Sequence, residues 1–514
     1  MRFYSLVPLI MKFLSKLSLS VSVAILVAGC AVKPKPFTQQ QLADFTGSVQ
    51  NDVAATSQSP SGAIDLNEAL ARAIKYNQDI RVEQLGIALG IAQTNLRSAD
   101  MLPGVVAGTD YFGRNNLALS RSNVSSVYST SSDQNNVSSN ISLSWNILDF
   151  GLSYVRAQQA ADKVMYQVEQ RRRAVGRIIE ETRSAYWRAV SLERLVARME
   201  ALQKDVNQAL ALAQAGARNP SIEPLPALSY QRDLLTIQRE LDSLRGSLIG
   251  AHEHLKQLIN MPQHEPLHLK ADRTAIDMPL VRMSPDENIQ TALDNRPEIR
   301  QLMYEMRINN QEAKVALLEM LPGINLSGGS SKDASSFLYH SNWVSWGAKA
   351  SWNLINVFRY PLKINNVKAQ NDLNQERAVA LAVAISAQVY VARARYTHNI
   401  TSYQNAVRYT NVQKQIVGQT HVATRLGRMG EQSLVRERMA TILAEAKQDM
   451  AYADLQNAYA GLLTSIGLDM LDYGQLHDVS VEQIAEYLRE TARESRESSA
   501  KIVAAHSKSK AGKQ

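Results

Sequence analysis

Apolar and polar residues alternate along two short segments of the chain, as they do in strands with one apolar face. In the first segment Asn and Ser separate the apolar residues Ile141, Leu143, Trp145 and Ile147. In the second segment the apolar positions are Ala348, Ala350, Trp352 and Leu354. The residues after Pro103, ahead of the first segment, have a strand-like composition. We therefore expect two β-hairpins, at about 104–149 and 323–357, with a Ser/Asn-rich loop around 120–139 in the first.

A much longer helical pattern follows each expected hairpin. The stretch from 152 to 215 contains one glycine and no proline, and the stretch from 362 to 426 shares both properties. Because globular helices usually span about a dozen residues, helices of this length indicate a coiled coil or a helical barrel. Returning helices complete two helical hairpins, at about 152–260 and 362–466. In the second long helix we expect these small and apolar residues to face the interior: Ala380, Leu381, Ala384, Ala387 and Val391.

Three sequence motifs occur twice along the chain. NQDIR at 77–81 and MLPG at 101–104 correspond to RPEIR at 296–300 and MLPG at 320–323, with one common separation. A third pair, SWNIL at 144–148 and SWNLI at 351–355, has a smaller separation, so a loop is shorter in the second copy. Such spacing indicates a tandem duplication. We expect a first repeat at 62–284 and a second at 285–470, each with the order helix, strand, loop, strand, very long helix, turn and returning helix.

The N-terminus has the charged, apolar and small-residue regions of a secretory signal peptide, which we place at 1–29, with Met11 as a possible true start. Residues 26–30, Leu-Val-Ala-Gly-Cys, resemble the bacterial lipobox, which implies a lipid on Cys30 and a lipidated, extended segment at 30–61. Cys30 is the only cysteine, and lipidation would account for an unpaired thiol in an exported protein. The alternative is a signal peptide cleaved near Cys30 without lipidation. Ala31 follows the cysteine, which favours the outer membrane.

Four of the five tryptophans lie in the expected strand regions. Aromatic rings concentrate where barrel strands cross a bilayer interface, so we predict an interfacial position for Trp145, Phe150, Trp343, Trp346 and Trp352. The alternative is a half-buried sheet of a soluble domain. Two hairpins supply four strands, and bacterial barrels need at least about eight. Several chains must therefore share one barrel, and a trimer would supply twelve strands.

Together, the lipobox, the two repeats, the inserted hairpins and the long helices resemble the TolC family of outer-membrane efflux proteins over about residues 62–470. The resemblance implies a mainly α fold with a membrane β-barrel. A homotrimer would form a twelve-stranded barrel, a periplasmic α-helical barrel and a mixed α/β equatorial belt, the belt coming from about 261–285 and 469–489. It also implies a passive exit duct for efflux or type I secretion, joined to an inner-membrane transporter by a periplasmic adaptor (membrane fusion) protein. No cofactor is expected beyond the lipid.

In that family the adaptor meets the tips of the helical hairpins, where the aperture also lies. The resemblance carries this role to the turns after each long helix, which contain Gly216, Arg218, Arg425, Gly427, Arg428, Gly430 and Glu431. Many relatives place acidic residues just after the second tip to narrow the aperture. This chain has Ser433 and Arg436 near those places, with Glu431 and Glu437 close by. Their charges either set the gate or simply solvate the tip.

Other classes of function find little support in the sequence. The net charge of +8 is spread along helical stretches with acidic residues interleaved, which argues against nucleic-acid binding. Enzyme motifs are missing, and His252 and His254, two residues apart on a helix, would point to opposite sides, so we expect no metal site. Residues 490–514 are expected to form a disordered tail. The main alternative to a channel is a coiled-coil lipoprotein that spans the periplasm without conducting.

Overall fold

The computed structural model describes residues 35–121, 127–217, 224–270, 284–467 and 479–490. The chain divides into two compact units, residues 1–57 and 58–514. The expectation of an extended segment at 30–61 was wrong, because its described part contains helix α2 (Gln39–Thr56), which begins with a capping box between Thr38 and Gln41. No residue of α2 is buried. The helix is therefore held by its own capping and backbone bonds.

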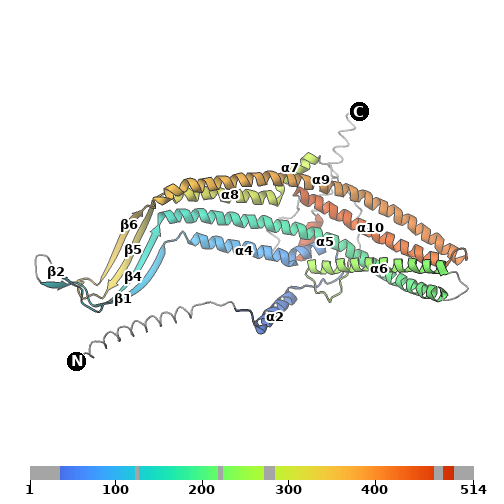
Figure 1. The fold of residues 1–514 in the computed structure, drawn as a ribbon, viewed down its shortest axis with the longest axis horizontal. Helices are drawn as coiled ribbons and strands as arrows, with labels where there is room; N and C mark the ends of the chain where they lie inside the picture. The colour runs from blue at the N-terminus through green and yellow to red at the C-terminus, as the bar shows by residue number, and fades with distance from the viewer. Residues whose placement is uncertain (1–34, 122–126, 218–223, 271–283, 468–478, 491–514) are drawn as a thin grey trace, which may run out of the picture. The chain divides into compact units, whose positions relative to one another are not determined.

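The second unit repeats one series of elements. The first copy contains α3 (Leu66–Tyr76), α4 (Gln78–Ala99), α5 (Ile147–Ala217) and α6 (Pro224–Leu258). The second copy contains α7 (Pro285–Asn295), α8 (Pro297–Leu318), α9 (Ile355–Arg425) and α10 (Glu431–Ile466). The long helices α5 and α9 each span 71 residues. In this unit the strands lie at one end, and the far ends of α5 and α9 lie with the starts of α6 and α10 at the other (Figure 1).

A four-stranded antiparallel sheet joins the two copies. It consists of β1 (Gly104–Gly113), β4 (Asn135–Asn146), β5 (Gly323–Asp333) and β6 (Asn342–Ser351), in the order β1-β4-β5-β6. The expectation of a plain loop around 120–139 was wrong. That region contains β2 (Leu119–Arg121) paired with β3 (Tyr128–Thr130), as well as the start of β4. Regular backbone pairing there satisfies polar groups that a plain loop would leave to water.

Two strands end earlier than the alternating sequence pattern predicted. Ile147 belongs to α5, because the Asn146 side chain accepts a hydrogen bond from the Leu148 amide at 3.0 Å and so starts the helix. Trp352 and Leu354 lie beyond the end of β6. Helix α9 starts before Pro361, although we expected it to begin near residue 362. Asn356 explains this early start, because its side chain donates to the Glu319 carbonyl at 2.9 Å and holds the first turn against the end of α8.

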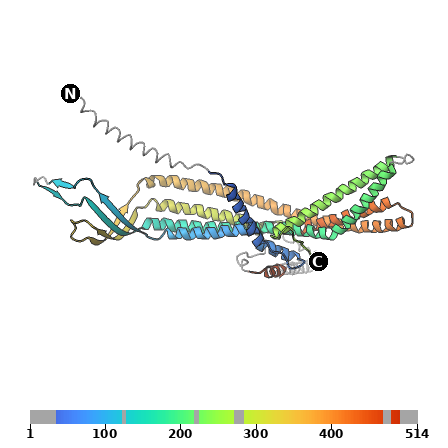
Figure 2. The ribbon, with the colours of Figure 1, turned by 90° about the horizontal axis from the view of Figure 1, so that it is seen from below.

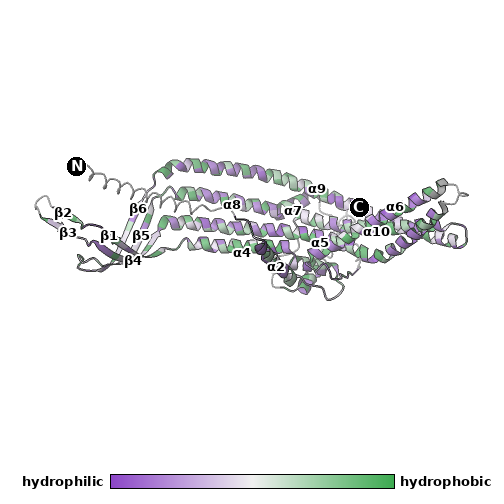
Figure 3. Ribbon diagram, turned by 60° about the horizontal axis from the view of Figure 1, so that its bottom comes forward, coloured by the Kyte–Doolittle hydropathy of each residue, from purple (hydrophilic) through white to green (hydrophobic). Residues whose placement is uncertain are grey.

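The helices lie side by side in the order of the strands. Next to the sheet the order is α4, α5, α8 and α9, as Figure 3 shows. Nearer the tips α6 and α10 replace α4 and α8, so that the order becomes α6, α5, α10 and α9 (Figure 2). The two edges of this helical layer are therefore α4 and α9 near the sheet, and α6 and α9 near the tips. Among the described residues, the main helix contacts of α6 are with α5, those of α4 are with α5 and α3, and those of α9 are with α7, α8 and α10.

Four hydrophobic clusters lie among the described residues, and the two largest hold most of the layer together. Near the tips, buried residues on α5 and α10 follow the alternating four- and three-residue spacing of a coiled coil: Leu195, Met199, Leu202, Val206, Val435, Met439, Ile442 and Ala446. Midway along the unit, Tyr186 of α5 donates to the carbonyls of Ile64 at 3.2 Å and Lys270 at 2.6 Å. Around this tyrosine the expected belt segments meet in one core, where Leu267 and Leu269 join Ile484 of the helical segment 481–490.

The expected interior stripe on α9 was wrong for the single chain. Ala380, Ala384, Ala387 and Val391 are exposed, and Leu381 is half-buried. The buried residues of this stretch are instead Ile385 and Val389. One 18-residue window of α9 has a mean hydropathy of 1.3, which by composition would allow a membrane span, yet only 11% of it is buried. The edge helix thus presents an apolar surface that this chain does not cover.

Candidate channel wall and helical tips

The four-stranded sheet has one apolar face. Its register aligns Val105, Leu143, Gly328 and Trp346 in one row across the strands, and Ala107, Ile141, Ser330 and Val344 in the next. Ile141, Val344 and Trp346 are 59%, 68% and 84% exposed. Apolar side chains in adjoining rows, left uncovered in this way, mark a surface made for another apolar medium or partner.

The opposite face of the sheet is polar. The register aligns Val106, Ser142, Gly329 and Ser345 in one row, and Gly108, Asn140, Ser331 and Trp343 in the next. The two central strands approach closely on this face: a Cβ added to Gly329 would lie only 2.6 Å from the Ile141 carbonyl oxygen. The sheet therefore separates an apolar side from a side lined mainly by hydroxyl and amide groups, with Val106 and Trp343 as apolar members of that side.

Both edges of this sheet are open within the described chain. Strands β1 and β6 each pair on one side only. Three successive antiparallel pairings make β1 and β6 antiparallel to each other. The β6 edge of one copy can therefore continue the antiparallel order with the β1 edge of another. Four strands alone cannot close a barrel.

The five aromatic residues that we predicted at a membrane interface lie at different places. Trp346 extends from the apolar face of β6, whereas Trp343 lies on the opposite face of the same strand, in register with Ser331. Trp145 packs edge to face against Phe150, with ring centroids 5.8 Å apart. Trp352 lies just beyond β6, and its indole donates to the Met320 carbonyl.

The turn between α9 and α10 brings together most of the expected tip residues. Arg425 ends α9, and Gly427 has a φ of +69°, a left-handed conformation that favours glycine. Gly430 is the N-cap of α10, and its carbonyl accepts the Ser433 amide at 3.0 Å. Glu431 then lies in the first turn of α10. In the other tip, Gly216 lies in the last turn of α5. Arg218 and Cys30 lie outside the described residues.

The sequence did not predict how the two tips are joined. Arg436 on α10 donates to Asp233 on α6 at 2.9 Å, which links the two helical hairpins. Arg438 pairs with Asp205 on α5 at 3.0 Å. Further from the tip, Arg194 and Arg198 of α5 pair with Asp449 and Glu445 of α10. The sequence does show two arginines four residues apart on α5 and two acidic residues four residues apart on α10, a spacing that places each pair on one helix face. Only the packing of the two helices shows which arginine meets which carboxylate.

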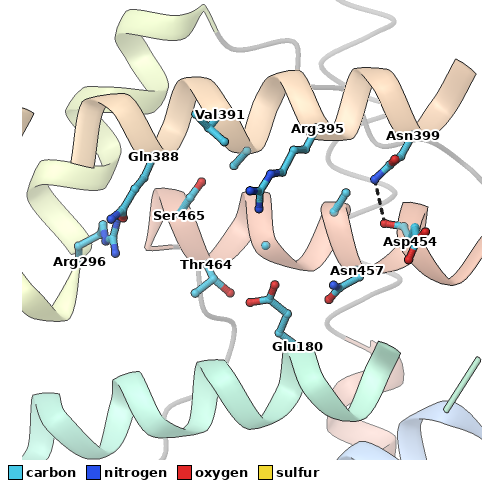
Figure 4. A pocket seen from close by; sticks show the side chains of 13 residues that line it. Glu180, Arg296, Gln388, Val391, Arg395, Asn399, Asp454, Asn457, Thr464 and Ser465 are labelled. Atoms are coloured by element: carbon cyan, nitrogen blue, oxygen red, sulfur yellow. Dashed lines mark hydrogen bonds between the residues drawn. The ribbon is translucent and has the colours of Figure 1, made fainter. Parts of the chain in front are cut away.

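A polar cavity of about 510 Å³ lies where α10 ends, between α5 and α9. Figure 4 shows Glu180 of α5 and Arg395 of α9 reaching toward it from opposite sides. Burial raises the pKa of the Glu180 carboxyl, the neighbouring Glu181 raises it further, and Arg395 opposes both. Among the described residues no cluster of three or more histidine, cysteine or acidic side chains is placed to hold a metal. His252 contacts Glu253 at 3.1 Å.

The comparisons with known proteins agree with this geometry. Residues 69–261 match the model of the outer membrane efflux protein family. Over this range the chain is similar to that efflux protein family. The matched range runs from α3 through α6, which is most of the first repeat. A search of curated proteins found no match to the sequence.

Solved channels share the fold of this chain. The Campylobacter jejuni CmeC outer membrane channel aligns with a TM-score of 0.62 at 15% identity, covering 83% of this chain and 89% of that one. The open-state Neisseria gonorrhoeae MtrE outer membrane channel aligns at 0.58 and 16% identity, covering 78% and 88%. The Vibrio cholerae outer membrane protein VceC aligns at 0.57 and 10% identity, covering 78% and 96%. At these identities the likeness concerns the fold, which also covers the second repeat.

Proposed function

We propose that this chain is one subunit of an outer-membrane channel, a passive exit duct for an efflux or type I secretion system. One observation carries the proposal: the sheet has an apolar face, a polar face and two open edges of opposite direction. In a bilayer every strand edge must be paired, so such a sheet is stable only when it closes with other copies. Closing it with the apolar face outward leaves the polar face around a lumen. The family consists of channels and not enzymes.

Three copies of the four-stranded sheet would supply twelve strands, which exceeds the minimum for a bacterial barrel. The helices support the same closure, because their order follows that of the strands. Edge helix α4 exposes Val82, Leu85 and Leu89, and edge helix α9 exposes Val379 and Val383. Packing α9 of one copy against α4 of the next would cover both stripes. We therefore propose a homotrimer whose barrel strands continue into a ring of helices.

The remaining parts of the proposal concern partners and anchoring. The tips formed by α5–α6 and α9–α10 would meet a periplasmic adaptor, which in turn would join an inner-membrane transporter. Exposed cationic and polar groups around Arg425, Arg428 and Glu431 support a docking surface there. A lipid on Cys30, supported by the lipobox, would add an anchor in the outer membrane. Protein purified from outer membranes should then carry acyl chains on Cys30, which mass spectrometry of the N-terminal peptide would detect.

Purified full-length protein tests the channel directly. In mild detergent we expect a complex of three times the monomer mass, with a modest β signal over dominant helix. In planar bilayers it should conduct, at least in variants with an opened tip. A helical monomer that is released from membranes without detergent would contradict the proposal. A membrane-bound trimer that never conducts would instead favour the periplasm-spanning structural lipoprotein.

A further inference from the structure

Both repeats make the same hydrogen bond at the joint between helix and sheet. The indole Nε1 of Trp145 donates to the Met101 carbonyl oxygen at 3.2 Å. The indole Nε1 of Trp352 donates to the Met320 carbonyl oxygen at 2.9 Å. Each methionine opens the MLPG motif, and each tryptophan belongs to the SWN motif of the same repeat. The two repeats differ in loop length and share little else in these strands, so the repetition of this bond indicates a common task.

The two accepting carbonyls lie where the preceding helix no longer supplies an N–H donor. Met101 lies just past α4, which ends at Ala99, and Met320 lies just past α8, which ends at Leu318. Carbonyls at the C-terminal end of a helix have no N–H group within the helix to bond with. The amides three and four residues later, which would serve such a carbonyl in a continuing helix, belong to strands β1 and β5. The indole therefore supplies the donor that the local backbone does not.

The bond also ties together segments that are far apart along the chain. Met101 marks the entry from α4 into β1, whereas Trp145 lies at the exit from β4 into α5. The second repeat adds a further tie, because Asn356 of α9 donates to the Glu319 carbonyl beside Met320 at 2.9 Å. At the first joint the chain just past α4 is thus fastened to the end of β4, and at the second the end of α8 is fastened to the first turn of α9.

We propose that Trp145 and Trp352 are positioning residues whose indole N–H groups lock the joints between the helical layer and the membrane sheet. The lock keeps the strands at one inclination to the helices, so that movement of the long helices at the tips does not reach the barrel. A tryptophan that only anchors the protein at a membrane interface needs its ring and polar edge in the bilayer boundary. A lock needs the N–H group to face one carbonyl. The consequence for conduction rests on the proposed channel function, whereas the bond itself does not.

Replacement of single tryptophans by analogues separates the two roles. At Trp145 or Trp352, 3-benzothienylalanine keeps the bicyclic ring but replaces the N–H with sulfur, and 5-fluorotryptophan keeps the N–H. Trp346 on the apolar face is the matched control, because it is 84% exposed. In planar bilayers we expect the sulfur analogue at either joint to add sub-conductance states and current noise. The fluorinated analogue at the joints and the sulfur analogue at Trp346 should behave like the unmodified channel.

Hydrogen exchange of the indole N–H groups tests the bond without relying on conduction. In the detergent-solubilised protein the Trp145 and Trp352 indoles should exchange about tenfold more slowly than that of Trp343 on the mainly polar face, the change expected for one net hydrogen bond. Slow exchange with no pores in any variant would leave the lock intact and overturn the channel function. Equal exchange at the three indoles would overturn the lock. So would joint variants whose current matches that of the Trp346 variant.

Discussion

Lys414 of α9 pairs with Glu445 of α10 at 3.1 Å, and the same carboxylate also accepts a hydrogen bond from Arg198 of α5. The Glu445 side chain is only 6% exposed, so two cations from two neighbouring helices meet one buried anion. This junction lies beside the coiled-coil core of the tips. It ties the first helical hairpin to the second within one chain.

The Glu445 junction predicts a dependence of stability on pH. Burial raises the pKa of the Glu445 carboxyl, but the hydrogen bonds and charges of Lys414 and Arg198 outweigh burial and leave the pKa below its usual value. A lowered pKa means that the stabilisation is complete above the unfolded pKa and is lost as the pH falls through the folded pKa. We expect the helical melting temperature to fall below about pH 4.5. Glu445→Gln should lower it at neutral pH and flatten this acid limb, and an acid limb of unchanged size would refute the assignment.

The ion pair between Arg436 and Asp233 predicts an effect on the aperture. Because exposed pairs contribute only about 0.2–1 kcal/mol, Arg436→Ala should change the melting temperature little. It should nevertheless raise the conductance in planar bilayers, since the pair joins the two hairpins at the tip. The exchanged pair Arg436→Asp with Asp233→Arg should restore the original current. If the exchanged pair conducts like the single variant, the contact between these two residues does not restrain the tip.

The two faces of β4 predict different tolerance to charge. Ile141 lies on the apolar face and Ser142 on the polar face, at neighbouring positions in the middle of the strand. An arginine facing lipid near the middle of a barrel strand costs about 2–4 kcal/mol. Ile141→Arg should therefore reduce the amount of trimer in outer membranes, whereas Ser142→Arg should assemble and alter ion selectivity. Equal assembly of both variants would show that the apolar face does not contact lipid.

The close approach of β4 and β5 predicts a strict requirement for glycine at one position. Gly329→Ala would place a methyl group 2.6 Å from the Ile141 carbonyl oxygen, so the strands must separate. Overpacking of this kind costs about 1–3 kcal/mol. The neighbouring Gly328→Ala is the control, because its nearest contact would be the Ser345 carbonyl oxygen at 3.9 Å. Thermal loss of the β signal should occur at lower temperature for the Gly329 variant only. Matching melting curves for the two variants would be inconsistent with the observed register.

The sequence by itself determined the duplication, the existence of the hairpins and the length of the long helices, because each depends on local spacing. Motifs such as MLPG recur regardless of how the chain packs. A long stretch without proline remains helical, and an alternation of apolar and polar residues specifies a strand with two different faces. The same local rules misjudged the ends of these elements. Asn146 and Asn356 set the starts of the long helices through contacts that the alternation does not record.

Only the tertiary structure decided which residues meet across the repeats. The stripe around Ala384 has the composition of an interior, yet it faces outward in the single chain, and only the proposed packing of α9 against a second copy would cover it. The pairing of Arg436 with Asp233, the Glu445 junction and the bonds from Trp145 and Trp352 all join segments distant in sequence. Such contacts depend on strand register and helix order, and no local periodicity encodes either of them.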